Sequence, residues 1–153
     1  MPSLSISSPV GYLVLEEAEG ALVTIRWLAG GDDVDPIAND SALLAEAARQ
    51  LDAYFAGKLT DFDLPLRPAG SAFEQRVWQR MQAIPYGKTR SYGELAAGIG
   101  SAARAVGGAC GRNPIPIVIP CHRVLAKTGL GGYSGAGGLK TKQTLLALEG
   151  TLG

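Results

Sequence analysis

Cys121 and His122 are adjacent in the sequence, and His122 is the only histidine of the chain. A thiol beside an imidazole can form a thiolate and imidazolium pair, which makes Cys121 a candidate nucleophile. Three prolines within residues 113–120 restrict the backbone, so the approach to Cys121 is predicted to be stiff and extended. Proline suits the first position of a helix, and the first turn that would then hold Cys121 has free amides that lower a thiol's pKa.

Another interpretation of Cys121 stays open on these residues alone, because free cysteine is often a buried apolar filler. Neighbouring side chains point about 100° apart on a helix and to opposite faces on a strand, so Cys121 and His122 need not touch. A water between them could relay a proton. We favour the interpretation of Cys121 as a nucleophile over that of a filler.

The composition is that of a globular protein: 153 residues, 46% hydrophobic. No apolar run approaches the roughly 20 residues that span a bilayer, and residues 1–10 lack the features of a signal peptide. We therefore expect a cytoplasmic protein with reduced thiols and no membrane partner. Two cysteines and one histidine argue against a tetrahedral zinc site made of protein ligands.

The two halves of the chain differ strongly in charge, although the formal net charge is zero. Residues 1–70 carry four basic and eleven acidic side chains, a balance of −7, and residues 71–153 carry ten and three, a balance of +7. The Pro-rich residues 64–70 are typical of a linker. We expect two domains, 1–70 and 71–153, of which the second has the sign that suits a polyanion.

The first half is expected to be a small α+β scaffold without a catalytic group. Its β-forming residues are grouped around a turn, and its later apolar residues have helical spacing. The expected elements are an edge strand at 4–7, a hairpin of 11–18 and 21–28 around Glu19 and Gly20, and a helix at 41–57 capped by Asp40 or Ser41.

The second half is expected to be mainly helical. Two capping-box sequences, in which Ser is followed three residues later by Glu, precede amphipathic segments. The expected helices are 71–84, opened by Ser71 and Glu74; 91–98, opened by Ser91 and Glu94; and 102–109, capped by Ser101.

The last two predicted helices, separated by glycines, have the pattern of a helix-turn-helix. The second carries almost only small side chains apart from Arg104. Such a helix can pack closely against a neighbouring helix or enter a nucleic-acid groove with Arg104 projecting. The DNA interpretation is favoured, because this helix lies in the basic half and leads directly to Cys121.

Six motifs follow one another along the second half: Ile84-Pro-Tyr-Gly87, Ser91-Tyr-Gly-Glu-Leu-Ala96, Ala103-Arg-Ala-Val-Gly107, Asn113-Pro to Pro120-Cys-His-Arg-Val124, Gly132-Tyr-Ser-Gly135 and Leu145-Leu-Ala-Leu-Glu-Gly150. Together they resemble the O6-alkylguanine-DNA alkyltransferase family. The resemblance implies an α+β protein: a small ribonuclease H-like N-terminal α/β domain, and a mainly helical C-terminal domain with a winged-helix-like helix-turn-helix.

The activity that the resemblance implies is one-shot DNA repair. The protein would flip an O6-alkylated guanine, or an O4-alkylated thymine, out of the duplex and transfer the alkyl group irreversibly to Cys121. His122 would act as the base through a water, Glu149 would orient His122, and Asn113 would brace the turn before the cysteine segment. No metal or organic cofactor is expected.

The resemblance also implies the contacts to the flipped base. Tyr92 would donate to guanine N3, Tyr133 would help to wall the pocket, and the Ser134 amide would bind O6. The carbonyls of Cys121 and Val124 would accept from the exocyclic amine, so the pocket would select guanine.

The implied partner is double-stranded DNA, bound through the minor groove by a monomer. Arg104 would fill the space left by the flipped base. The other residues expected at DNA are Ser101, Ala102, Ala103, Ala105 and Gly107 on the recognition helix. The candidates for phosphate contacts are Arg90, Arg112, Arg123 and Lys127, and for each of these an ordinary solvated surface charge stays open.

Two features depart from the family pattern. The loop from Gly135 to Gly138 is two residues longer than usual, which bears on the register of Ser134. Cys110 stands where an apolar pocket residue is common, and it could be a passive wall or a second reactive thiol.

Three other functions stay open: a non-catalytic alkyltransferase-like protein that binds lesions, a transcriptional regulator, and a cysteine hydrolase. The presence of Cys121 argues against the first, and the lack of a separate regulatory domain in 153 residues argues against the second. The third fits Tyr92 less well, because Tyr92 suits a guanine leaving group.

Overall fold

The computed structural model describes residues 2–28, 41–133 and 135–151. Contacts divide the chain into two compact units, Met1–Ala69 and Gly70–Gly153. None of the helices in the described part is long and apolar enough to cross a lipid bilayer.

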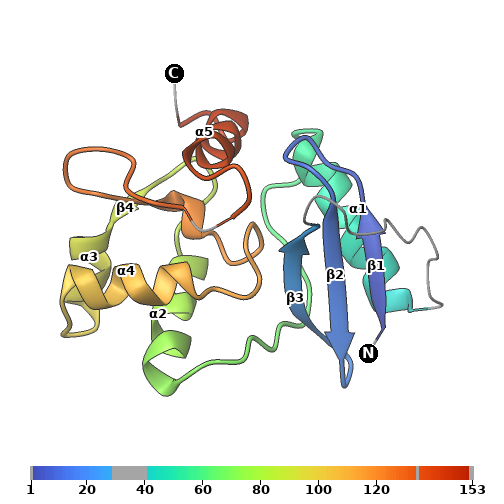
Figure 1. Ribbon diagram of the computed structural model, residues 1–153, viewed down its shortest axis with the longest axis horizontal. Coiled ribbons are helices and arrows are strands. Elements are labelled where there is room, and N and C mark those ends of the chain that lie inside the picture. Colours follow the sequence, from blue (N-terminus) through green and yellow to red (C-terminus); the bar gives the residue numbers. More distant parts are fainter. Residues whose placement is uncertain (1, 29–40, 134, 152–153) are drawn as a thin grey trace. The chain divides into compact units, whose positions relative to one another are not determined.

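The N-terminal unit is a three-stranded antiparallel sheet with a helix on it (Figure 1). Its elements are β1 (Ser3–Ile6), β2 (Leu13–Ala18), β3 (Ala21–Trp27) and α1 (Ala42–Phe55). Glu19 and Gly20 both have positive φ, 51° and 79°, which lets the hairpin close in two residues. The predicted hairpin and helix are therefore confirmed. Ser41 caps α1 through Leu44 N, while Asp40 lies outside the described residues.

The C-terminal unit is mainly helical, with α4 packed against α2 and α3 (Figure 1). Both predicted capping boxes are present, Ser71 with Glu74 and Ser91 with Glu94. The indole of Trp78 donates to Ala109 O at 2.9 Å and joins α2 to α4. The elements are α2 (Ala72–Gln82), β4 (Arg90–Ser91), α3 (Tyr92–Gly98), α4 (Ala103–Gly111), the 3-10 turn η1 (Cys121–Arg123), β5 (Val124–Leu125) and α5 (Leu139–Leu148).

The predicted capping of α4 by Ser101 is wrong. The N-cap is Ala102, which makes no side-chain hydrogen bond. Ser101 instead closes the preceding helix: Gly100 has φ 67°, and the Ser101 amide donates to Ala96 O at 2.9 Å. This is the 6→1 bond of a Schellman motif, so Ser101 belongs to the end of α3 rather than to the start of α4.

Two very short strands bring distant segments of the C-terminal unit together. β4 and β5 pair in parallel, with Arg90 opposite Val124 and Ser91 opposite Leu125. Tyr92 follows β4 directly and Cys121 precedes β5 by three residues, so this pairing holds both at one place.

Candidate active site

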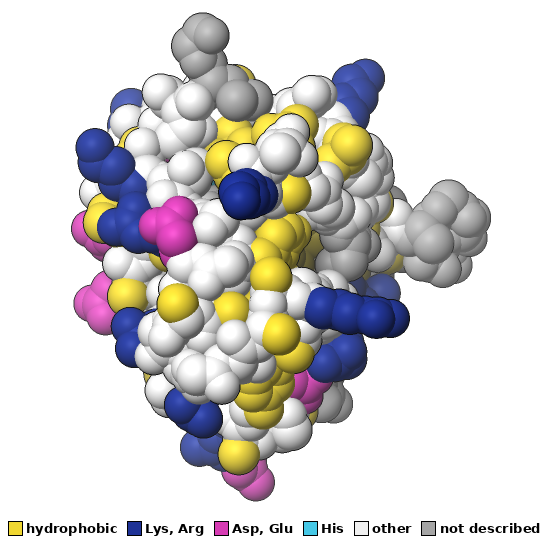
Figure 2. Space-filling view, turned by 90° about the vertical axis from the view of Figure 1, so that its left-hand side faces the viewer, with side chains coloured by type: hydrophobic (Ala, Val, Ile, Leu, Met, Phe, Trp, Pro, Cys, Tyr) yellow, Lys and Arg dark blue, Asp and Glu magenta, His cyan; other side chains and the backbone are white. Residues whose placement is uncertain are grey.

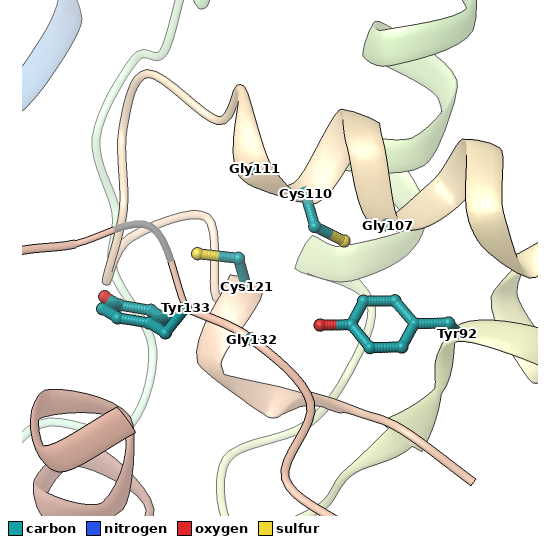
Figure 3. A pocket seen from close by; sticks show the side chains of 7 residues that line it. All are labelled: Tyr92, Gly107, Cys110, Gly111, Cys121, Gly132 and Tyr133. Carbon is teal, nitrogen blue, oxygen red and sulfur yellow. The ribbon is translucent and has the colours of Figure 1, made fainter. Parts of the chain in front are cut away.

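A pocket of about 470 Å³ lies in the C-terminal unit (Figure 3). It is walled by side chains of α3, α4 and η1 and by the loop before α5, and the rings of Tyr92 and Tyr133 stand on opposite sides of it. Its lining consists of Tyr92, Gly107, Cys110, Gly111, Cys121, Gly132 and Tyr133. Three glycines and two cysteines leave room for a flat ligand between the two rings.

Cys121 lies at this pocket. It does not lie in the first turn of an α-helix, which is where the sequence analysis expected it. It opens a single 3-10 turn of three residues, and it is 6% exposed. Burial raises the pKa of the Cys121 thiol; a hydrogen bond with the Asn113 side chain, the charge of Lys142 and nearby backbone amides oppose this in part. The predicted lowering of the pKa is therefore wrong, because so short a turn has little macrodipole and burial dominates. The resting thiol is protonated and needs a base.

His122 is fully buried and contacts Glu149, with 2.7 Å between Nε2 and Oε2. A carboxylate at Nε2 places the ring proton on that nitrogen. Burial lowers the pKa of His122 against the opposing effect of Glu149, and the charges of Arg123 and Lys142 lower it further. His122 is therefore a neutral imidazole whose buried Nδ1 has no hydrogen-bond partner among the described residues and is free to accept a proton.

Arg123 does not face DNA, and its predicted phosphate contact is wrong. Its side chain is 7% exposed and grips Glu149 with two donors, Nε at 2.8 Å from Oε1 and Nη2 at 3.1 Å from Oε2. Nη1 donates to Ile84 O at 2.7 Å. A guanidinium in this bidentate geometry fixes a carboxylate well. Arg123 therefore orients Glu149, which in turn orients His122.

Asn113 ties the segment before Cys121 into a tight loop. Its Oδ1 accepts from Ile115 N at 3.0 Å and its Nδ2 donates to Ile119 O at 2.8 Å. Within this loop Ile117 is fully buried and has φ 74°, a left-handed conformation that β-branched residues rarely adopt. Asn113 and the packing around Ile117 together determine where the chain enters η1.

Tyr92 lies at the first position of α3, with its hydroxyl directed into the pocket (Figure 3). Burial raises the pKa of Tyr92, and the two cysteine thiols raise it further. The hydroxyl is therefore protonated and can donate. Gly131, with φ 72°, lets the following loop pass close to this ring: a Cβ there would lie 2.9 Å from Tyr92 Cε2.

Gly131→Ala is expected to displace Tyr92 and to slow the alkyl transfer that the resemblance implies roughly 10- to 100-fold, because a misplacement of about 1 Å can lower a rate about 10²-fold. The single-turnover rate with free O6-benzylguanine measures this. Gly100→Ala is the matched control, since Gly100 has a similar positive φ of 67° and its Cβ would have no atom within 4 Å. Equal rates for the two variants would contradict the close approach.

Cys110 is a wall of the pocket, and its thiol is a poor nucleophile. Burial raises its pKa to about 12, with a further contribution from Cys121. Its sulfur lies 3.5 Å from the sulfur of Met81. Of the two roles left open for Cys110, the passive one fits these surroundings.

Lys142 is a residue of the site that the sequence analysis missed. It is fully buried on α5, and its Nζ donates to the carbonyls of Val124, at 2.7 Å, Gly132, at 3.0 Å, and Leu130. The spacing offered a signal: Lys142 shares the helical face of Leu145, three residues on. A lysine on the apolar face of a helix is expected to have buried hydrogen-bond acceptors.

The carbonyls expected to hold a base already have one protein partner each. Val124 O accepts from Lys142, and Cys121 O accepts from Val124 N. A carbonyl has two lone pairs, so each retains one for a ligand. Ser134 lies outside the described residues, and its predicted amide contact has no structural counterpart here.

The longer glycine loop closes on itself rather than entering the pocket. Gly138 N donates to Gly135 O at 3.0 Å, which folds the four residues into a turn. The hydroxyl of Thr141 donates to Ala136 O. Residues 135–138 therefore form a turn just before α5.

The side chains expected at DNA are mostly exposed. Arg104 is exposed and has no hydrogen-bond or ion-pair partner in the part of the chain that the structure describes. Arg112 is also exposed but pairs with Glu74. On the face shown in Figure 2, Lys and Arg side chains are spread around an area of apolar and backbone atoms. The remaining exposed positions at the start of α4 are Ala102, Ala103 and Ala105, while Ser101 and Gly107 are half-buried.

Comparisons with known proteins match both units of the chain to one family. Residues 72–151 match the 6-O-methylguanine DNA methyltransferase, DNA binding domain, and residues 4–68 match the ribonuclease-like domain of the same enzymes. The methylated-DNA–protein-cysteine methyltransferase of Mycolicibacterium paratuberculosis is 49% identical over 152 residues, which cover 95% of this chain and 90% of the relative. That of Methanosarcina acetivorans is 45% identical, with 94% and 95% covered.

Solved structures show the same similarity. The crystal structure of Mycobacterium tuberculosis O6-methylguanine methyltransferase has a TM-score of 0.84 and 45% identity, covering 97% of this chain and 92% of that one. The crystal structure of Mycobacterium tuberculosis OGT in complex with DNA has a TM-score of 0.83 and 47% identity, covering 96% and 91%. With both domains matched and relatives near half identical along almost their whole length, this chain belongs to the 6-O-methylguanine DNA methyltransferase family.

Proposed function

We propose that this chain repairs DNA directly, by moving the alkyl group of O6-alkylguanine irreversibly onto its own Cys121. The observation that carries the proposal is the thiol of Cys121 at a pocket, next in sequence to a neutral imidazole that is held by Glu149. Family membership supports the same chemistry. O4-alkylthymine is a second substrate of the same kind.

The reaction begins with removal of the thiol proton. Neutral His122 accepts it at Nδ1 through a water, and the imidazolium that forms is stabilised by the Glu149 carboxylate at Nε2. The Cys121 thiolate then attacks the alkyl carbon in line with the C–O6 bond. The S–C bond forms, the C–O6 bond breaks, and its electron pair stays on guanine.

The departing guanine must be neutralised. Tyr92 donates a hydrogen bond to N3, and the guanine finally takes up one proton. In the overall reaction a thiol and an alkylated base are converted to a thioether and guanine. The proton lost by Cys121 is thus balanced. Because the thioether is stable, each molecule reacts once.

DNA is bound by the C-terminal unit as a monomer inside the cell, with α4 in the minor groove. The exposed alanines at the start of α4 support this, since they allow the backbone to approach a narrow groove. Arg104 occupies the space of the flipped base and offsets part of its unstacking, which takes a few kcal/mol. Salt weakens the complex, because phosphate contacts supply most of the affinity.

Mass spectrometry after incubation with a duplex that contains O6-methylguanine tests the proposal. One methyl per molecule on Cys121, with guanine restored in the DNA, is the expected result. Turnover without protein modification would indicate a hydrolase, and lesion binding without either would indicate a non-catalytic recruiter.

Arg104→Ala is expected to slow repair of duplex DNA by roughly 10- to 100-fold, since the loss of 1.4–2.7 kcal/mol of support for the flipped state has that effect. Reaction with free O6-benzylguanine should stay at the wild-type rate, because a free base needs no flipping. Single-turnover rates with both substrates provide the measurement. Equal losses with both would remove Arg104 from the flipping step.

A further inference from the structure

Lys142 brings a buried positive charge to the pocket, and the reaction described so far makes no use of it. The side chain is 0% exposed, and its three carbonyl partners match the three donors of an ammonium group. Nζ also lies 5.8 Å from the centroid of the Tyr92 ring. Burial lowers the pKa of the Lys142 ammonium, whereas its three carbonyl acceptors favour the charged form, which alone has three donors.

These contacts join two pieces of backbone that both border the site. Val124 follows η1 and belongs to β5, which pairs with β4. Leu130 and Gly132 belong to the loop that carries Tyr133. Gly132 and Tyr133 line the pocket. The ammonium is therefore a clamp between the nucleophile's segment and the loop that carries Gly132 and Tyr133.

The charge of Lys142 has no carboxylate partner: it forms no ion pair with any Asp or Glu in residues 2–28, 41–133 and 135–151. The Tyr92 ring beside Nζ lines the same pocket as the thiols of Cys121 and Cys110, and the charge of Lys142 lowers the pKa of both thiols and of the His122 imidazole. All four are uncharged in the resting protein. A buried charge without a counter-charge is unfavourable, so a thiolate formed beside it is stabilised.

We infer that Lys142 is a positioning residue for alkyl transfer: its ammonium clamps the wall that carries Gly132 and Tyr133 onto Val124, and it is the counter-charge of the Cys121 thiolate. The inference rests on the proposed function for the reaction that it serves. The clamp and the charge, however, are properties of the protein alone and can be measured without DNA.

Two substitutions separate the parts of this role. Lys142→Met keeps the length of the side chain and removes the donors and the charge, while Lys142→Arg keeps the charge and the donors. Lys140→Met is the matched control, because Lys140 lies two residues earlier on α5 with an exposed side chain. Transfer from free O6-benzylguanine to Cys121 is measured, so that DNA binding does not enter.

Lys142→Met is expected to slow benzyl transfer at neutral pH by about 10²- to 10³-fold, the effect of removing one preorganised electrostatic partner. The loss should shrink as the pH rises, since the missing charge matters less where the thiolate forms anyway. Lys142→Arg should recover part of the rate at neutral pH, and Lys140→Met should match the wild type.

Two readouts do not depend on alkyl transfer. The pH profile of Cys121 carboxamidomethylation by iodoacetamide should move to higher pH in Lys142→Met, because a positive neighbour lowers the pKa of a thiol. Amide hydrogen exchange should accelerate in residues 129–133 while the amides of α2 stay protected.

The outcomes distinguish this inference from the proposed function. A wild-type protein that takes no methyl group from an O6-methylguanine duplex refutes the function, and the thiol titration and the exchange still decide the role of Lys142. An active wild type with Lys142→Met as fast as Lys140→Met would overturn the inference. The inference would also be overturned if Lys142→Met left both the pH profile of Cys121 carboxamidomethylation and the amide exchange of residues 129–133 unchanged.

Discussion

Cys121→Ser should abolish alkyl transfer, with the single-turnover rate on an O6-methylguanine duplex lower by at least about 10⁴-fold, as for other removed nucleophiles. A serine hydroxyl remains protonated beside a neutral imidazole, and oxygen is a weaker nucleophile than sulfur toward an alkyl carbon. Binding of the damaged duplex should persist, because Cys121 is 6% exposed and serine has nearly its size. Radiolabelled methyl transfer and a gel shift measure the two properties.

Cys110→Ser is the control for this experiment, since it removes the other thiol of the same pocket. We expect it to take up one methyl group per molecule, because the pKa of Cys110 near 12 keeps this thiol protonated at neutral pH. Methyl transfer that survives in Cys121→Ser and disappears in the double variant would reassign the acceptor to Cys110.

Glu149→Gln should impair both catalysis and stability. The carboxylate charge stabilises the imidazolium of His122, and a positioned acid–base group contributes about 10²- to 10⁴-fold, so transfer should slow within that range. The same change leaves Arg123 as a buried cation without its counter-charge, which destabilises a protein by about 3–5 kcal/mol. Single-turnover kinetics and urea unfolding check the two effects.

Glu74→Gln tests whether these effects come from burial. Glu74 also pairs with an arginine, Arg112, but at the surface, and glutamine can replace glutamate in its capping box. Stability and transfer should both stay close to wild type. A Glu149→Gln protein as stable and active as Glu74→Gln would show that the buried network contributes little.

Local patterns in the sequence predicted the elements well where a pattern was long enough. The period-2 strands around Glu19 and Gly20, and the capping boxes at Ser71 and Ser91, depend on residues within a few positions of one another. β4 and β5 have two residues each and therefore no periodicity. Their pairing, which sets Tyr92 beside the Cys121 segment, exists only through tertiary contacts.

The chemistry of the site was predictable in its residue types but not in its electrostatics. The motifs identified Cys121, His122 and Glu149, which the structure brings together. Whether an arginine meets water or a buried carboxylate depends on packing over 26 residues of separation, so the sequence placed Arg123 at DNA. The same limit concealed Lys142, whose three acceptors are backbone carbonyls that any residue type could offer.

Ile117 makes the approach to the nucleophile unusually intolerant of replacement. Its side chain is fully buried, which favours a large aliphatic residue, while its φ of 74° favours glycine or asparagine. Glycine would relieve the backbone and leave a cavity, and valine or leucine would fill the space and keep the strain. Replacement of Ile117 by a smaller residue and replacement by another aliphatic residue are therefore both unfavourable. A scaffold into which only residues 120–124 were grafted would contain the thiol but not the loop that positions it.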